Sequence, residues 1–189
     1  MSIDSLNKIK HLVATCKRCS YVDKPFIEHR VYDMYTGKEI RTLIISESPP
    51  PGTKKDFLYN LSAKDRLRRV LSKYLGIDET ELIAKLVENG VLWDMAVRCR
   101  PRDKHSINAM SKNCSYITRI VLDLLRPDIL ILLGRVAQQQ FKSIEQNLSY
   151  RPHTIVFEKH PLYVIRFEKN RANHYFDNLA SYILRTPKH

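Results

Sequence analysis

Four cysteines are the residues of this sequence whose types and spacing most clearly allow chemistry. Cys16 and Cys19 form a CxxC pair, whereas fourteen residues separate Cys99 from Cys114. A zinc ribbon usually carries two CxxC pairs, and the second pair here is too widely spaced for one. A four-thiolate iron–sulfur cluster accepts ligands from separate segments of a chain. The spacing therefore predicts a metal site, with iron–sulfur or zinc as alternatives, against four unrelated buried or free thiols.

Basic residues flank these cysteines along the sequence. Positive charge offsets the charge of thiolates and lowers their pKa values. The flanking residues are Lys17, Arg18, Arg98, Arg100 and Arg102.

Short apolar runs alternate with helical patterns and must position these groups. The runs at residues 42–46, 91–97, 128–133 and 154–157 predict strands. Helices are expected at residues 6–13, 62–75, 78–89, 106–126, 134–143 and 170–184, with Ser62, Asp78 and Ser106 as caps.

Helices between strands imply crossover connections and a parallel sheet. Apolar runs without alternation indicate strands that are buried on both faces. We therefore expect an α/β fold: one domain over residues 1–189, built as a three-layer α/β/α sandwich around a mainly parallel four-stranded sheet. Ligands in such folds bind beyond the carboxyl ends of the strands. The segments that follow the strands there are 47–60, 98–105, 134–135 and 159–166.

The overall charge favours a polyanionic partner. The chain has 189 residues, a formal net charge of +12 and a pI near 9.6. Nucleic acid is the first candidate partner and an anionic membrane surface the second, with a merely basic globular protein as the plain alternative. No apolar run is long enough for a membrane span, and the N-terminus lacks the pattern of a signal peptide. A cytoplasmic monomer without a membrane partner is expected, with reduced thiols.

Four ordered segments carry a resemblance to a known family. They read SESP at 46–49, VRCRP at 97–101, LRPDI and then LGRVA within 125–137, and HPLYVIR at 160–166. These segments resemble the GEAP, VKCRPP, IRPxVI…LGRxA and HPxYLLR motifs of the iron–sulfur uracil-DNA glycosylases, called family 4. The similarity spans roughly residues 16–166, with all four cysteines in place.

The resemblance implies a 4Fe-4S cluster on the four cysteines and DNA, single- or double-stranded, as the partner. It also implies that a target nucleotide is flipped out and its N-glycosidic bond hydrolysed. His160 matches the histidine that donates to the uracil oxygen as the base leaves. Glu47 matches a glutamate that places the water or stabilises the sugar, and Phe57 matches the phenylalanine that stacks on the base. In plainer interpretations, His160 is a turn residue, Phe57 is core and Glu47 pairs with a nearby lysine.

The resemblance also implies DNA contacts around this site. Leu162 and Tyr163 match the wedge that fills the gap left in the base stack. Backbone contacts and close approach to DNA are expected at Gly52, Lys54, Lys55, Arg135 and Arg166. Arg135 is a solvated helix-start residue in the plainer interpretation.

The sequence departs from the family pattern at the base-reading positions. Met95 stands where the family has an asparagine that reads the uracil edge, and a thioether cannot make the paired contacts of an amide. Asp94 is the candidate substitute beside it. Pro50 replaces a glycine of the first motif, and Gly52 follows two residues later. Asn60 is a further candidate for base recognition or water positioning, against a plain role at a helix entry.

Three functions therefore stand as alternatives. The first is a DNA glycosylase that acts on uracil or another deaminated base. The second is a non-catalytic or differently active nucleic-acid-binding member of the same superfamily. The third is a zinc-bound basic α/β domain that binds RNA or a protein.

Overall fold

The centre of the protein is a four-stranded, wholly parallel sheet. The structure is a computed structural model, and it describes residues 3–184. The strand order is β2-β1-β3-β4. The strands are β1 (Thr42–Ser46), β2 (Val91–Met95), β3 (Ile129–Leu133) and β4 (Thr154–Glu158). In the register, Ile44 lies opposite Trp93 of β2 and Ile131 of β3.

Burial explains why three of these strands are continuously apolar. Every residue of β1, β2 and β3 is buried, because helices cover both faces of the sheet. β4 is the edge strand, and its Phe157 remains 47% exposed. The predicted α/β/α sandwich with a parallel four-stranded sheet is confirmed.

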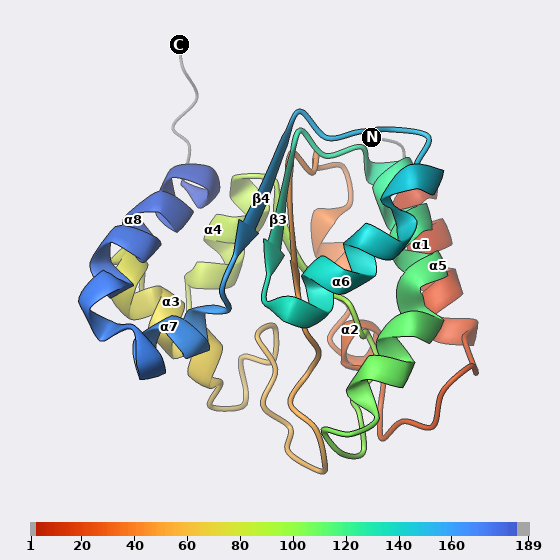
Figure 1. Ribbon diagram of the computed structural model, residues 1–189, viewed down its shortest axis with the longest axis horizontal. Coiled ribbons are helices and arrows are strands. Elements are labelled where there is room, and N and C mark those ends of the chain that lie inside the picture. Colours follow the sequence, from red (N-terminus) through yellow and green to blue (C-terminus); the bar gives the residue numbers. More distant parts are fainter. Residues whose placement is uncertain (1–2, 185–189) are drawn as a thin grey trace.

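Two groups of helices cover the two faces of the sheet (Figure 1). One group is α1 (Ile3–Thr15), α5 (Ile107–Leu125) and α6 (Arg135–Ile144). The other is α3 (Arg66–Leu75), α4 (Leu82–Glu88), α7 (Pro161–Phe167) and α8 (Ala172–Ile183). The short elements are α2 (Pro25–Glu28) and the 3₁₀ helices η1 (Val31–Tyr35), η2 (Glu145–Asn147) and η3 (Lys169–Arg171). Within residues 3–184, no helix combines the length and apolar character that crossing a bilayer requires.

The helix caps differ from those expected. Asp65, not Ser62, caps α3, because its carboxylate accepts the Arg68 N–H at 2.7 Å. Asp78 accepts the Thr80 N–H in a turn that precedes α4. Ser106 makes no side-chain cap bond at the start of α5. Each boundary therefore lies within a few residues of its predicted position, while the capping atoms differ.

The segment after β4 forms a helix, α7, which the sequence predicted only as a strand-end segment. His160 and Pro161 account for it. Proline at the first helical position has its φ already set for a helix and lacks only an N–H that would be unpaired there. The His160 side chain caps the same end by accepting the Leu162 N–H. This helix fixes the residues that follow β4 beside the end of the sheet.

Candidate active site

A cavity of about 620 Å³ opens at the carboxyl end of the sheet. Three segments that follow strands enclose it, after β1, β3 and β4. The lining residues are Glu47, Ser48, Pro49, Pro50, Pro51, Leu133, Gly134, Arg135, Gln138, Glu158, Lys159, His160, Leu162 and Tyr163. The segment after β2 does not line it. Of the candidate site residues, Glu47, Arg135, His160, Leu162 and Tyr163 therefore share one cavity.

Gly134 lets β3 turn into α6 at the wall of this cavity. Its φ is +87°, a backbone conformation that glycine adopts without strain. Its N–H donates to the Glu158 carbonyl at 2.8 Å, which ties the ends of β3 and β4 together. A Cβ at Gly134 would lie 3.6 Å from the His160 Cβ. The two strand ends therefore bring His160 against the start of α6.

His160 is a neutral hydrogen-bond donor at neutral pH. Its Nδ1 accepts the Leu162 N–H at 3.2 Å, so the ring proton resides on Nε2. Burial lowers the pKa of His160 to about 4, because the charged imidazolium is poorly solvated there. A neutral imidazole with its proton on Nε2 can donate to an oxygen that gains negative charge.

Glu47 stands at the rim of the same cavity. Burial of its carboxyl raises the pKa of Glu47, although the charges of Lys104 and Arg135 act in the opposite direction. A carboxylate with a raised pKa is a stronger base toward water. Within residues 3–184 no ion pair joins Glu47 to Lys54 or Lys55, which the plainer interpretation required.

Gln138 is a cavity residue that the sequence analysis missed. Its Nε2 donates to the carbonyls of Leu132 at 3.2 Å and Glu158 at 2.8 Å. Its Oε1 has no hydrogen-bond partner in the part of the chain that the structure describes. Its position one turn into the helix after Gly134 was the available signal, because that turn faces the strand ends.

Exposed aromatic rings extend from the cavity along α7. Tyr163 is 45% exposed and Phe167 is 61% exposed, and their ring centroids are 4.9 Å apart. Lys159 Nζ lies 5.3 Å from the Tyr163 ring, and Arg166 Cζ lies 5.0 Å from the Phe167 ring. The sequence analysis named Tyr163 and Arg166 but not Phe167. Paired aromatic rings with adjacent cations can stack on nucleobases and contact the phosphate backbone.

The loop after β1 carries three further candidates outside the cavity lining. Gly52 has a φ of +86°, and its N–H donates to the Pro101 carbonyl at 2.9 Å. Lys54 and Lys55 are exposed in the same loop. Both side chains are therefore accessible to a partner, and their expected contacts with DNA stay a prediction.

Two base-binding candidates have partners inside the protein. Phe57 is fully buried, with ring centroids 5.1 Å from Phe26 and 5.6 Å from Tyr59. The Asn60 amide is used at both ends: Oδ1 accepts the Ser62 N–H and Nδ2 donates to the Lys55 carbonyl. Neither residue lines the cavity, and their contacts match the plainer roles in core and turn.

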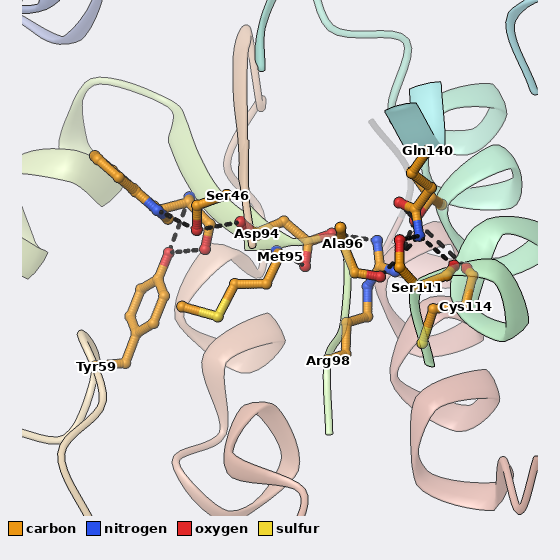
Figure 2. Close-up of polar contacts among 11 residues, drawn as sticks. Ser46, Tyr59, Asp94, Met95, Ala96, Arg98, Ser111, Cys114 and Gln140 are labelled. Atoms are coloured by element: carbon orange, nitrogen blue, oxygen red, sulfur yellow. Dashed lines mark hydrogen bonds and ion pairs between the residues drawn. The ribbon is translucent and has the colours of Figure 1, made fainter. Parts of the chain in front are cut away.

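Asp94 lies in a buried polar network beyond the cavity lining (Figure 2). One carboxylate oxygen accepts from Arg98 Nη2 at 2.5 Å, and the other accepts the Met95 N–H at 2.7 Å. Both side chains of the ion pair are essentially unexposed. Burial raises the pKa of Asp94, and the Arg98 charge opposes this rise. Met95 is also buried, so both residues stand apart from the cavity that His160 lines.

The network continues from Arg98 to α5 and α6. Arg98 Nη1 donates to Thr118 Oγ1 at 3.0 Å, and Thr118 in turn donates to Gln140 Oε1 at 2.8 Å. Gln140 Nε2 donates to the carbonyls of Ala96 and Ser111. This chain of bonds joins the end of β2 to the helix that carries Cys114 (Figure 2).

The four cysteines gather from three segments: the loop after α1, the turn after β2, and α5. Cys99 and Cys114 are buried, and all four thiols are free. The pKa of Cys99 is raised to about 12. The main cause is burial of the thiol, and the charges of Cys114, Cys16 and Cys19 act in the same direction. The charges of the other three thiols therefore all act on the Cys99 thiol. Among residues 3–184, however, no three Cys, His, Asp or Glu side chains are close enough to hold a single metal ion.

Charged and polar groups border the thiols. Lys24 Nζ donates to the Cys16 carbonyl at 2.8 Å, and its charge opposes the rise of the Cys99 pKa. Asn113 Nδ2 lies 3.4 Å from Cys19 Sγ. Of the expected cations, Arg100 is buried and paired with Asp23 at 2.9 Å. Thiolates are ligands for zinc and for iron–sulfur clusters alike, so the donor set is compatible with either.

Comparison with known protein families defines the class. The sequence model of the uracil DNA glycosylase superfamily matches residues 34–183, which is most of the chain, and the protein belongs to that superfamily. Members of the superfamily are DNA glycosylases, which bind DNA and excise bases. This is the functional class to which the protein is assigned. No curated protein matches the sequence significantly. Cys16 and Cys19 precede the matched range.

Proposed function

We propose that this protein removes a deaminated base, uracil or a related one, from DNA by hydrolysing its N-glycosidic bond. One observation carries the proposal: a neutral histidine with its proton on Nε2 and the carboxylate of Glu47 line the same cavity at the carboxyl end of the sheet. Membership of the superfamily and the basic charge support it.

The bond that breaks joins C1′ of the sugar to a ring nitrogen of the base. The base leaves with the bonding electrons, and negative charge develops on its carbonyl oxygens. The Nε2–H of His160 donates to one such oxygen and stabilises the leaving anion. Water supplies the oxygen that bonds to C1′. Glu47 stabilises the positive sugar or accepts the proton that this water loses. The departing base anion takes up a proton from solvent, so that the net reaction consumes one water.

The DNA contacts follow from the rim of the cavity. A flipped nucleotide leaves a gap in the base stack, and Leu162 and Tyr163 at the start of α7 are positioned to fill it. Arg135 at the rim and Arg166 on α7 contact the phosphates. Binding of this kind weakens steeply with salt.

A 4Fe-4S cluster held by the four cysteines is part of the proposal. Support comes from four free thiols on three segments and from the effect of the Cys16, Cys19 and Cys114 charges on the Cys99 pKa. The cluster would cross-link the loop after α1 to the turn after β2 and to α5. Anaerobically purified protein is expected to contain iron and acid-labile sulfide and to absorb visible light. Zinc without sulfide would contradict the cluster and favour the zinc alternative.

The testing experiment is an excision panel. Cluster-loaded protein is incubated with single- and double-stranded oligonucleotides that carry uracil, hypoxanthine, xanthine or mismatched thymine. Release of free base and an alkali-labile site is expected for at least one deaminated base. His160→Ala is expected to lose about 10²–10³-fold in rate, as for other donors to a developing anion. The control is His153→Ala, which removes an exposed histidine outside the cavity.

A second candidate function is nucleic-acid binding without base release. Phe57, Asn60 and Met95 favour it, since none of these base-binding candidates lines the cavity. Salt-dependent DNA binding with every substrate of the panel left intact would establish this function. Excision that His160→Ala abolishes would refute it.

A further inference from the structure

Gln138 holds a fixed amide at the wall of the cavity that His160 also lines. It lies in the first turn of α6, which begins directly after Gly134. Its Nε2 donates to two carbonyls at the ends of β3 and β4, Leu132 and Glu158. Because carbonyls only accept hydrogen bonds, these contacts fix which end of the amide is NH₂.

The consequence is an acceptor without a donor. The Gln138 Oε1 has no partner in the part of the chain described, although a carbonyl oxygen has two lone pairs. The amide cannot rotate to present its NH₂ to a ligand without giving up two hydrogen bonds. A ligand in this cavity therefore meets Gln138 as an acceptor alone.

His160 presents the opposite character. Its Nδ1 is taken by the Leu162 N–H, so its Nε2–H can only donate. Both residues line the same cavity. A donor and an acceptor whose roles are each fixed by backbone contacts form a two-point recognition site.

We propose that Gln138 Oε1 accepts the ring N–H of the flipped base while His160 Nε2–H donates to the neighbouring carbonyl oxygen. This inference rests on the proposed function and assigns the base-reading role, vacated by Met95, to a residue on another element. The ligand class is a base with a lactam edge, in which a ring N–H stands beside a carbonyl.

Deamination creates such an edge. In cytosine the ring nitrogen beside the exocyclic amine accepts hydrogen bonds, and in uracil it carries a hydrogen and donates. Adenine and hypoxanthine differ in the same way. An acceptor-only group selects the deaminated base, because the parent base would place two acceptors against each other and leave both unpaired.

The experiment compares bases that differ only in this N–H. Binding of free uracil and of 3-methyluracil is measured calorimetrically, and excision is measured separately on single-stranded oligonucleotides that contain uracil or N3-methyluracil. Wild-type protein is expected to prefer uracil by at least tenfold in both assays. Gln138→Leu is expected to reduce the binding and the excision of uracil about tenfold and to leave those of 3-methyluracil unchanged, as loss of one hydrogen bond predicts. Gln139→Leu, at the exposed neighbouring position, is the matched control.

The ratio between the two bases separates recognition from structure. A merely structural role in clipping β3 to β4 would weaken both bases equally, and the inference would then be wrong. Equal handling of both bases by wild-type protein would also overturn it, even if Gln138→Leu fails to fold. Selective binding of uracil without any excision would refute the proposed function while supporting this inference. Excision with the same base preference in wild-type protein and Gln138→Leu would refute this inference while supporting the proposed function.

Discussion

Replacement of Asp94 separates a structural role from a chemical one. The carboxylate is buried, accepts from Arg98 Nη2 and the Met95 N–H, and lies outside the cavity lining. Asp94→Ala leaves the Arg98 guanidinium buried without a counter-charge. Breaking a buried pair in this way costs about 3–5 kcal/mol. For a chain of this size, that loss corresponds to a fall in Tm of about 6–20 °C.

A second substitution tests the reason for that loss. Arg98 Nε is already buried without a hydrogen-bond partner in the described structure, so the pair is imperfectly satisfied. Replacing both charges, as in Asp94→Ala with Arg98→Met, removes the stranded guanidinium. We expect the double variant to be more stable than Asp94→Ala alone, by about 2 kcal/mol or more.

The assays are urea and thermal unfolding, followed by excision measured per mole of folded protein. The control is Asp177→Ala, an exposed carboxylate on α8, for which a change within about 0.5 kcal/mol is expected. If Asp94→Ala loses less than about 1 kcal/mol of stability yet excises 100-fold more slowly, the structural reasoning is wrong. Asp94 would then act in the chemistry, as the sequence predicted.

Three further predictions concern the cavity and its rim. The His160 ring is expected to titrate near pH 4 by NMR, and a midpoint above pH 6 would contradict this. Its contribution to stability should be complete above about pH 6.5 and diminish as the pH falls toward 4, because between these values only the unfolded chain takes up the proton. Glu47→Gln should slow excision by about 10²-fold or more and remove the acid limb of the rate profile, with unchanged DNA affinity, whereas a matching loss of affinity would indicate a binding role. Phe167→Ala, alone or with Tyr163→Ala, should weaken single-stranded DNA binding by about 1–3 kcal/mol per ring in a fluorescence titration, while exposed Leu61→Ala should have no effect; equal effects of these substitutions would refute the stacking role.

The sequence predicts the sheet well because its buried strands are continuous apolar runs. Ile129–Leu133 is apolar at every position, which only a strand covered on both faces requires, and the helices between strands force a parallel order. Caps are harder to predict. Ser62 and Asp65 are both good capping residues three positions apart, and the choice depends on where Arg68 is buried against the carbonyls of the preceding loop.

The site was predictable where a side chain follows a strand directly and not where it acts from the next helix. Glu47 and His160 sit at strand ends, and both reach the cavity. Gln138 gave a weaker signal, namely its place in the helix that follows β3, because glutamine in a helix is ordinary and its partners are carbonyls at strand ends. The position of Asp94 shows what the sequence could not give: along the chain it adjoins the position of the missing amide, whereas in space its carboxylate is paired with Arg98, four residues further on.

One buried arginine after β2, Arg100, connects the loop that follows Cys16 and Cys19 to the cavity wall. Arg100 Nε donates to Asp23, in the loop that follows Cys16 and Cys19, and Arg100 Nη1 donates to the Pro50 carbonyl in the cavity wall. Arg100 adjoins Cys99, so the same turn supplies a thiol and the guanidinium that fixes the wall. Asp23 and the Pro50 carbonyl are thereby both held by one charged side chain, that of Arg100. A cluster bound at the cysteines would act on the cavity by holding its shape, without touching the base.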